Sequence, residues 1–321
     1  MRVVVIANPA SRGGWVRREA PNLERQITAE LGRGHGASGE LGPVEFAYTE
    51  RAGDGTRLAK KAIEAGATTL VSLGGDGTHR EVASGLLELG AGDRVGLGIL
   101  NAGTGGDFRK LLEGGSSIAT GCETIRTKPA AAVDAGIVTF AHDNGRRESM
   151  HFLNIASLGM GGLVDRHVAR SSKVLGGKAT YLAASLRAFF EYTPATVKVE
   201  IDGRDEGTYR ISNICVCNGQ FAGGGMHFAP QARLADGEFD VIILEDAPLG
   251  PALLVAKGLY DGSHLRSPTV HSKRGKHVVI TPTTEARAYM DIDGEAPGVA
   301  PAEFTLLPKA LRVHGVRPDC L

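Results

Sequence analysis

The sequence has few cysteines, no excess of charge of either sign and no long hydrophobic run. Its 321 residues include 36 basic and 36 acidic side chains, a balance that does not favour general binding of nucleic acid. No apolar stretch approaches the roughly 20 residues of a membrane-spanning helix. The apolar run at residues 3–7 is too short for a signal peptide. We therefore expect a soluble, cytoplasmic protein that binds no nucleic acid.

Metal and redox motifs of the common kinds are also absent. Of the four cysteines, Cys215 and Cys217 alternate along an expected strand and so face the same side. We interpret them as buried thiols in a reducing compartment rather than as a metal or redox pair. The ten histidines form no His-x-x-x-His or similar cluster, and no zinc site is predicted.

Neither of the two commonest nucleotide fingerprints is present. No Gly-x-Gly-x-x-Gly follows the first apolar run, and no Gly-Lys-Ser/Thr occurs. What the chain has instead is 45 glycines, several of them in turns that directly follow apolar runs. The length suits two domains, each able to bury its own core.

The most informative of these turns lies within residues 69–89. An apolar run, Leu70 to Leu73, leads into Gly74-Gly75-Asp76-Gly77-Thr78, and a helical pattern follows. Glycines let a backbone close around a phosphate, and the N–H groups of a helix start favour an anion. An aspartate there would repel phosphate unless a cation lies between them, so we interpret Asp76 as facing Mg²⁺ and a nucleotide. An ordinary surface turn is the alternative.

Strand-like and helix-like segments alternate through the first 130 residues. Apolar runs at 3–7, 44–49, 70–73 and 95–100 are separated by expected helices that include 17–31 and 54–65. This alternation predicts a doubly wound open sheet, whose ligands lie beyond the carboxyl ends of the strands. Polar residues follow all four runs, which predicts a nucleotide site there; they are Asn8 with Ser11, Thr49, Asp76 and Thr104.

After about residue 130 the pattern changes to short strands joined by polar turns. Strands are expected at 131–140, 149–156, 195–201, 210–217, 238–244, 277–281, 288–292 and 303–307, an all-β pattern. A helix at 178–192 has an apolar face that suits core packing better than an acyl-chain wall. We expect a nucleotide-binding α/β domain over 1–130, a β-sandwich domain over 131–313, and a tail, 314–321, whose packing on the first domain is left open.

Two acidic stretches of the second half have the composition of functional sites. Asp291, Asp293 and Glu295 would share one side of the chain if it stays extended. Their repulsion would raise a pKa or attract a cation, and either suits a base that takes an alcohol proton; a solvated strand end is the alternative. The turn around Asp236 suits a hard cation about as well as it suits a plain hairpin.

Several of these motifs together resemble the diacylglycerol kinase catalytic-domain superfamily, which includes sphingosine kinases, ceramide kinases and soluble bacterial lipid kinases. They run in order along nearly the whole chain: Asn8-Pro9-x-Ser11, Gly74 to Thr78, Gly103-Thr104-x-x-Asp107-Phe108, Phe152 to Gly159, Gly177-Lys178-x-x-Tyr181, Asn218-Gly219 with Gly223 to Met226, Asp236-Gly237, Asp293-Gly294-Glu295 and residues 307–313. NAD kinases resemble the chain at the Gly74 to Thr78 turn.

The resemblance implies a nucleotide domain, a β-sandwich domain and an active site in the cleft between them. It implies ATP contacts at Thr49, at residues 74–80 and at Thr104. It also implies a structural Mg²⁺ held by the Asp236 side chain and the carbonyls of Arg233 and Glu238. The general base is placed within Asp293-Gly294-Glu295, at either carboxylate.

Our leading hypothesis is therefore an ATP-dependent lipid kinase acting on a primary hydroxyl of diacylglycerol, ceramide or a sphingoid base. Asp293 or Glu295 would accept the hydroxyl proton, and Asp76 and Asp107 would hold Mg²⁺. The residues expected to bind nucleotide are Asn8, Ser11, Thr49, Gly74, Gly75, Asp76, Gly77, Thr78, Gly103 and Thr104. Positioning and charge neutralisation dominate catalysis of phosphoryl transfer.

Two other functions remain as alternatives. An NAD kinase is expected to have an Asn-Glu pair, and this chain has no Asn-Glu dipeptide. A non-catalytic, kinase-like lipid- or nucleotide-binding regulator is supported only by Gly106, which stands where the family usually has asparagine. Arg12 and Arg80 are further departures, at positions where glycine and asparagine are common.

A lipid kinase without a membrane span is expected to lie at the membrane periphery and to touch the bilayer transiently. Two groups of cationic residues are candidates, although each also suits an ordinary solvated face. They are Arg166, Arg170, Lys173 and Lys178, and separately Lys273, Arg274 and Lys276. A homodimer is left open.

Overall fold

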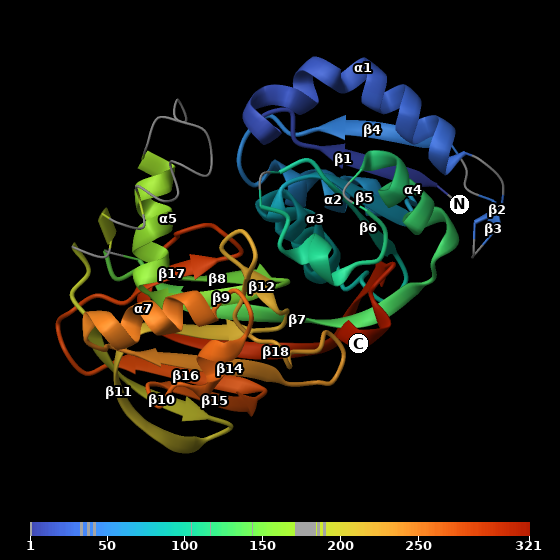
Figure 1. Cartoon of the computed structure of the whole chain (residues 1–321). Coiled ribbons are helices and arrows are strands. Elements are labelled where there is room, and N and C mark those ends of the chain that lie inside the picture. Colours follow the sequence, from blue (N-terminus) through green and yellow to red (C-terminus); the bar gives the residue numbers. More distant parts are fainter. Residues whose placement is uncertain are drawn as a thin grey trace. The chain divides into compact units, whose positions relative to one another are not determined.

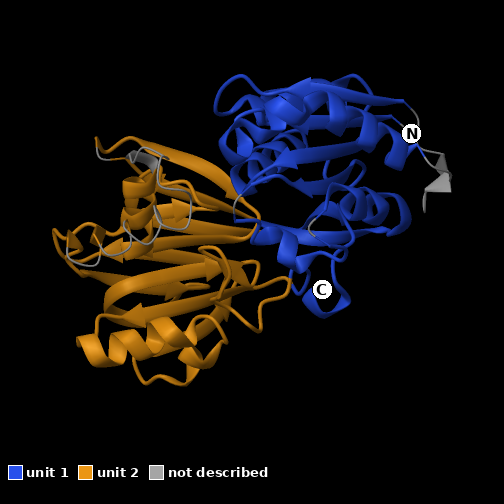
Figure 2. Cartoon of the chain, turned by 45° about the horizontal axis from the view of Figure 1, so that its top comes forward, with its two compact units in different colours: residues 1–135, 234–236, 308–321 blue, residues 136–233, 237–307 orange. Residues whose placement is uncertain are grey.

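The computed structural model describes residues 2–32, 35–36, 39–40, 43–103, 105–115, 117–142, 144–170, 184, 187–188 and 191–321. The chain divides into two compact units (Figure 2). Unit 1 comprises residues 1–135, 234–236 and 308–321, and unit 2 comprises 136–233 and 237–307. The short pieces 234–236 and 308–313 thus group with unit 1, although the sequence suggested the second domain for them. Most of the helix expected at 178–192 lies outside the described residues.

Unit 1 is built on a parallel sheet with the strand order β6-β5-β1-β4. Its strands are β1 (Val3–Ala7), β4 (Val44–Tyr48), β5 (Thr69–Gly74) and β6 (Gly96–Asn101). Every residue of β1 and β5 is buried, as expected for central strands of a sheet covered on both faces. The predicted doubly wound sheet is confirmed.

Helices cover this sheet (Figure 1). They are α1 (Ser11–Leu31), α2 (Asp54–Glu64), α3 (Asp76–Glu88) and α4 (Ile118–Thr127), with a 3₁₀ turn, η1 (Phe108–Leu111). Leu23 and Ile27 of α1 and Cys122 and Ile125 of α4 pack in one buried cluster with Val5. Helices α2 and α3 pack against each other. A two-residue pair, β2 (His35–Gly36) with β3 (Gly39–Glu40), lies between α1 and β4 in the sequence.

Unit 2 is mainly antiparallel. Its elements are β8 (Arg147–Phe152), β9 (Ile155–Gly159), α5 (Met160–Arg170), β10 (Ala195–Ile201), β11 (Arg204–Cys217), β12 (Phe221–Ala222), β13 (Met226–His227), β14 (Phe239–Glu245), α7 (Leu249–Gly258), η3 (Ser263–Arg266), β15 (Val270–Gly275), β16 (His277–Pro282) and β17 (Tyr289–Ile292). Strand β10 alternates buried and half-buried residues, the pattern of a sheet with one face on a core. That core contains Phe152, Phe239, Met290 and Phe304, and the predicted β-sandwich domain is confirmed.

Two long strands continue from one unit into the other. Strand β7 (Ala130–Ala141) leaves unit 1, and β18 (Val299–His314) returns to it. The end of β18 pairs in parallel with β6 at Arg312 and Val313, which explains why residues 308–313 group with unit 1. A short 3₁₀ turn, η4 (Pro318–Cys320), follows near the C-terminus.

The strand expected at 149–156 is in fact two strands, β8 and β9. The backbone N–H groups of Leu153, Asn154 and Ile155 donate to the carboxylate of Asp293 instead of to a neighbouring strand. A side chain 138 residues further along the chain therefore interrupts the run, which no local pattern indicates.

All four cysteines are buried and form no disulfide, which confirms their interpretation as buried thiols. Burial raises the pKa values of Cys215 and Cys217 well above the ordinary thiol value, so neither is a reactive thiolate near neutral pH. Among the described helices, none combines the length and apolar composition needed to cross a membrane.

Candidate functional site

Two glycine turns of unit 1 touch each other backbone to backbone. Gly75 lies between β5 and α3 in an extended conformation, and Gly103 follows β6. A Cβ atom on Gly103 would lie 2.6 Å from the Cα atom of Gly75, so only glycine fits there. The N-cap residue of α3 is Gly75, which has no side chain to cap the helix, and this leaves the first-turn N–H groups suited to an anion.

Asp76 connects the turn at Gly75 to the loop that follows Gly103. Its Oδ2 atom accepts the backbone N–H of Gly106 at 2.9 Å, and its Oδ1 atom accepts the N–H of Phe108 at 3.4 Å. The sequence predicted only that Asp76 faces a cation. In the structure the same carboxylate also fixes the start of η1.

Asp76 and Asp107 both lie beside Gly105. A Cβ atom on Gly105 would be 3.3 Å from Oδ2 of Asp76 and 4.0 Å from Oδ2 of Asp107. Asp107 is buried and forms an ion pair with Lys110, in which Oδ1 of Asp107 and Nζ of Lys110 are 2.6 Å apart. The unit therefore brings two carboxylates together at the carboxyl edge of its sheet.

Gly106 has a left-handed backbone, with φ +69°. A Cβ atom on Gly106 would lie 2.4 Å from Nδ2 of Asn101. The Oδ1 atom of Asn101 accepts the N–H of Gly103 at 3.2 Å. The Asn101 amide thus occupies space beside Gly106 and holds the second glycine turn. Thr104, another predicted nucleotide contact, lies outside the described residues.

The turn after β1 carries the remaining predicted phosphate ligands. Asn8 donates from Nδ2 to Oγ1 of Thr78 at 3.1 Å, which joins this turn to α3. Ser11 begins α1, but Arg12, Gly13 and Gly14 have φ of 50°, 63° and 78°, so the right-handed helix begins only after them. Beside them opens a hollow of about 340 Å³, lined by Arg12, Trp15, Glu19, Asn22, Leu23, Gln26, Asn101, Ser117 and Ile118.

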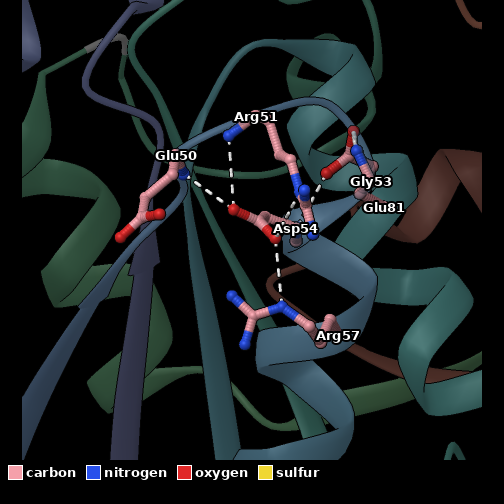
Figure 3. A network of polar contacts seen from close by, with 7 residues as sticks. Glu50, Arg51, Gly53, Asp54, Arg57 and Glu81 are labelled. Carbon is pink, nitrogen blue, oxygen red and sulfur yellow. Dashed lines mark hydrogen bonds and ion pairs between the residues drawn. The ribbon is translucent and has the colours of Figure 1, made fainter.

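A polar network that the sequence did not reveal fixes the turn after β4, which begins at Thr49 (Figure 3). The buried Asp54 accepts the N–H groups of Glu50 and Arg51 at 2.9 and 3.2 Å and pairs with Nε of Arg57 at 3.0 Å. The N–H of Glu50, then the Arg57 side chain, lowers the pKa of Asp54 below its ordinary value.

Glu81 completes this network from α3. Its two carboxylate oxygens accept the N–H groups of Gly53 and Gly55, each at 2.8 Å. The N-terminus of α2 is therefore tied to α3 about one turn beyond Asp76 and Thr78. Thr49 itself donates its N–H to the carbonyl of Ala7 at 2.9 Å, which aligns it with the turn after β1.

In unit 2 the chain does not stay extended through Asp291, Asp293 and Glu295, so the expectation that these acids share one side is wrong. Asp293 and Gly294 have φ of 49° and 87°, and Ile292 donates its N–H to the carbonyl of Glu295 at 2.8 Å. The chain therefore turns at Asp293-Gly294, and the three acids do not share one side. The predicted raised pKa is found at Asp291, where burial raises it well above its ordinary value.

Asp293 is engaged on both of its oxygens. Oδ2 accepts the N–H of Leu153 at 2.8 Å, and Oδ1 accepts the N–H groups of Asn154 and Ile155 at 3.1 Å each. Hydrogen bonds of this kind favour the ionised form of a carboxylate and weaken it as a base.

The predicted structural cation site remains a prediction. Asp236 is exposed and precedes Gly237, which has φ +79°. The carboxylate of Glu238 pairs with Nη1 of Arg274 at 3.0 Å. This pair does not affect the prediction, which takes only the backbone carbonyls of Glu238 and Arg233 as ligands. Within the described residues, no three His, Cys, Asp or Glu side chains are grouped to hold a metal, so a cation would also need carbonyl or phosphate oxygens.

Comparisons with known proteins now give the family. A model described as the diacylglycerol kinase catalytic domain matches residues 2–138, and one described as the YegS C-terminal NAD kinase beta sandwich-like domain matches residues 154–315. A Pseudomonas aeruginosa protein named probable lipid kinase YegS-like is 35% identical over 269 residues, which cover 82% of this chain and 81% of that protein. This chain belongs to the diacylglycerol kinase family of lipid kinases.

Other members and solved structures agree with this assignment. The Bacillus subtilis protein named diacylglycerol kinase is 29% identical over 272 residues, or 84% of each chain. A Bacillus anthracis structure titled as a diacylglycerol kinase shares the fold, with a TM-score of 0.69, 19% identity and coverage of 100% of this chain and 98% of that chain. Yeast NADH kinase, in complex with NADH, has a TM-score of 0.50 at 12% identity over 99% of this chain and 84% of its own. The lipid-kinase fold is thus related to that of NAD kinases.

Proposed function

We propose that this family member is an ATP- and Mg²⁺-dependent lipid kinase that phosphorylates a primary hydroxyl, with diacylglycerol as the leading substrate and ceramide or a sphingoid base as the alternatives. The observation that carries the proposal is the Asp76 carboxylate, which joins two glycine turns at the uncapped start of α3. Residues 1–130 would bind the nucleotide, and residues 131–313 would bind the lipid. Relatives named diacylglycerol kinase support this choice of substrate.

The residues of unit 1 fit a magnesium nucleotide. The glycine turns leave no Cβ where a phosphate would approach, and α3 presents its N–H groups. Mg²⁺ in phosphoryl-transfer enzymes is held by one or two carboxylates together with substrate phosphates, a donor set that Asp76 and Asp107 supply. The other proposed contacts are Asn8, Ser11, Thr49, Gly74, Gly75, Gly77, Thr78, Gly103 and Thr104.

We assign the proton acceptor to Glu295. The oxygens of Asp293 already accept three backbone N–H groups, so Asp293 anchors the turn and Glu295 takes the proton. The lipid oxygen gives this proton to Glu295 and bonds to the γ-phosphorus, while the bond from that phosphorus to the bridging oxygen of ADP breaks. A structural Mg²⁺ at Asp236, with the carbonyls of Arg233 and Glu238, is part of the proposal.

The protein is proposed to act in the cytoplasm, at the membrane periphery. Of the predicted cationic groups, Lys173 and Lys178 lie outside the described residues, and Arg166 stacks on the ring of Tyr289. Lys273 pairs with Glu206 at 2.9 Å and Arg274 with Glu238 at 3.0 Å. These pairs neutralise much of the second group, which weakens it as a bilayer contact.

Helix α7 offers a better surface for the bilayer. The strongly exposed large apolar side chains of the described residues are Leu249, Leu253, Leu254 and Tyr260 on or just after α7, together with Leu321. The helix carries one cation, Lys257, and no acidic residue, which suits an anionic lipid surface. We propose that α7 touches the membrane that holds the lipid substrate.

The test compares acceptors in one assay. Purified protein with MgATP is given detergent micelles of diacylglycerol, ceramide or sphingosine, and separately NAD, and each product is identified by mass spectrometry. We expect a phosphorylated lipid and no NADP, with the product lost in Glu295→Gln. Phosphorylated NAD would revive the NAD kinase alternative. ATP binding without ADP release on any lipid would favour the non-catalytic regulator.

A further inference from the structure

A row of polar side chains crosses three strands of unit 2 beside the Asp293 turn. Cys215 of β11 lies opposite Ser157 of β9, and Ser157 lies opposite Asp291 of β17. Helix α5 packs on β9 and β17 above this row (Figure 1). The approach is close, because a Cβ atom on Gly162 would lie 2.4 Å from the carbonyl oxygen of Tyr289.

Asp165 of α5 meets Asp291 across this contact. The two carboxyl groups lie within hydrogen-bonding reach of each other, and a hydrogen bond between them needs one proton, because two carboxylates can only accept. Burial first, then the negative charge of Asp165, raises the pKa of Asp291 well above its ordinary value; burial raises that of Asp165 to about 6. Both directions favour a pair that holds one proton over a pair of two carboxylates.

Among the described residues, no cationic side chain is found to neutralise the pair. The Cys215 thiol stays protonated, and Asp293 adds negative charge. On α5, the Arg166 guanidinium lies 4.9 Å from the centre of the Tyr289 ring, and His167 pairs with Glu191 at 2.9 Å. Retention of the proton is thus the way in which the pair avoids two adjacent negative charges.

Asp291 is at the same time tied to the catalytic turn. Its Oδ1 atom accepts the N–H of Gly294 at 2.9 Å. Glu295 follows directly and is paired with Ile292 through two backbone hydrogen bonds of 2.8 and 3.0 Å. A protonated Asp291 can satisfy both partners, because one oxygen accepts from Gly294 while the hydroxyl donates to Asp165.

We propose that Asp165 and Asp291 are positioning residues that, through one shared proton, hold the Asp293-Gly294-Glu295 turn so that Glu295 points at the substrate hydroxyl. This inference rests on the proposed role of Glu295. Neither residue touches the substrate. Loss of the shared proton as pH rises separates the two carboxylates, loosens the turn at Gly294 and lowers turnover.

The test uses two substitutions that differ in one respect. Asp291→Asn imitates the protonated acid, because its carbonyl can accept from Gly294 and its NH₂ group can donate to Asp165. Asp291→Ala removes both bonds. We expect Asp291→Asn to keep kcat within about threefold of wild type and to lose the alkaline decline. Asp291→Ala should lower kcat at least tenfold with the KM for ATP unchanged, and Asp165→Ala should behave alike.

Two measurements on the substrate-free protein separate this inference from the proposed function. Amide exchange at Gly294 should be faster in Asp291→Ala and unchanged in Asp291→Asn. The melting temperature of wild type should fall more with rising pH than that of Asp291→Asn. A carboxyl group whose native pKa is raised stabilises the fold less as pH rises, and asparagine does not titrate. Asp205→Asn, at an exposed position of unit 2, is the matched control and should change neither.

Wild-type exchange at Gly294 in Asp291→Ala overturns the inference whatever the activity shows. A wild-type kcat in Asp291→Ala also overturns it, as does an unchanged alkaline decline in Asp291→Asn. If the wild-type protein phosphorylates no lipid, the proposed function fails, and the exchange and unfolding data still decide whether the acid pair holds the turn. If Asp291→Ala does not fold, Asp165→Ala takes its place in the same measurements.

Discussion

The carboxylate of Asp76 accepts the backbone N–H of Gly106 at 2.9 Å. An acidic side chain at the start of one glycine turn therefore holds the loop that follows the next. This contact gives Asp76 a structural role in addition to its proposed contact with Mg²⁺. The two roles are separable by experiment, because one concerns the free energy of unfolding and the other concerns turnover.

Asp76→Asn should abolish phosphoryl transfer and also weaken the fold slightly. The amide keeps one accepting oxygen but turns an NH₂ group towards a backbone N–H, at a cost of about 1–2 kcal/mol in the free energy of unfolding. Chemical denaturation and turnover assays measure the two effects, with the exposed Asp93→Asn as control. Near-normal turnover in Asp76→Asn would contradict the role in Mg²⁺ binding.

Gly106→Asn, which installs the residue common in the family, should not improve the enzyme. The left-handed backbone tolerates asparagine, but its Cβ atom would meet Nδ2 of Asn101, 2.4 Å away. We expect a lower melting temperature and weaker ATP binding. Adding Asn101→Ser should raise the melting temperature again only in part, because it also removes the hydrogen bond from Gly103 to Asn101. An unchanged melting temperature in the single variant would show that Asn101 moves aside freely.

Asp293 and Glu295 should separate into a structural and a catalytic residue. Asp293→Asn disturbs three backbone hydrogen bonds and should lower the free energy of unfolding by about 2–4 kcal/mol. Glu295→Gln should keep the melting temperature and lose at least 1,000-fold in kcat, a typical scale for loss of general base catalysis. The opposite pair of results would return the base to Asp293.

Acid should destabilise the wild-type protein partly through Asp54. Its native pKa is lowered, first by the N–H of Glu50 and then by Arg57. Asp54 therefore stabilises the fold above its unfolded pKa, and this contribution is lost as pH falls through the native pKa. Unfolding midpoints followed from pH 7 downwards should fall less steeply in Asp54→Asn than in wild type or Asp93→Asn. Parallel curves would show that Asp54 carries no such linkage.

Replacement of Leu253 and Leu254 by serine should detach the protein from vesicles without unfolding it. Both side chains are mostly exposed, at 60% and 72%, so little packing is lost. We expect less co-sedimentation with anionic vesicles and a severalfold higher KM for vesicle-borne lipid, but unchanged activity on a soluble short-chain lipid. Leu321→Ser, at 38% exposure, is the control. Equal co-sedimentation of all three proteins would exclude α7 as the contact.

The sequence predicted what depends on local pattern. Fully apolar runs followed by glycine turns predicted β1, β5 and β6 and the nucleotide edge of unit 1, and alternation predicted β10. Helix α7 and β15 were missed. The α7 sequence, Leu249 to Gly258, is apolar on nearly all sides, so it lacks the one-sided periodicity that indicates a helix packed on a core.

Contacts between distant residues account for the rest. The Asp293 carboxylate breaks an expected strand 138 residues earlier, and Asp291 meets Asp165 from another element. The expected one-sided row of Asp291, Asp293 and Glu295 failed because Asp293 adopts φ +49°, which is uncommon for a residue other than glycine. Side-chain pairing across such separations leaves no periodic signal in the sequence.

The most direct test of the account is transfer of labelled phosphate. ATP labelled with ¹⁸O in its γ-phosphoryl group is incubated with Mg²⁺, the purified protein and a total lipid extract, and all products are resolved by mass spectrometry. We predict a lipid phosphomonoester that carries the label and is absent with Glu295→Gln. Label found only in inorganic phosphate or in NADP, with none in any lipid, would contradict it.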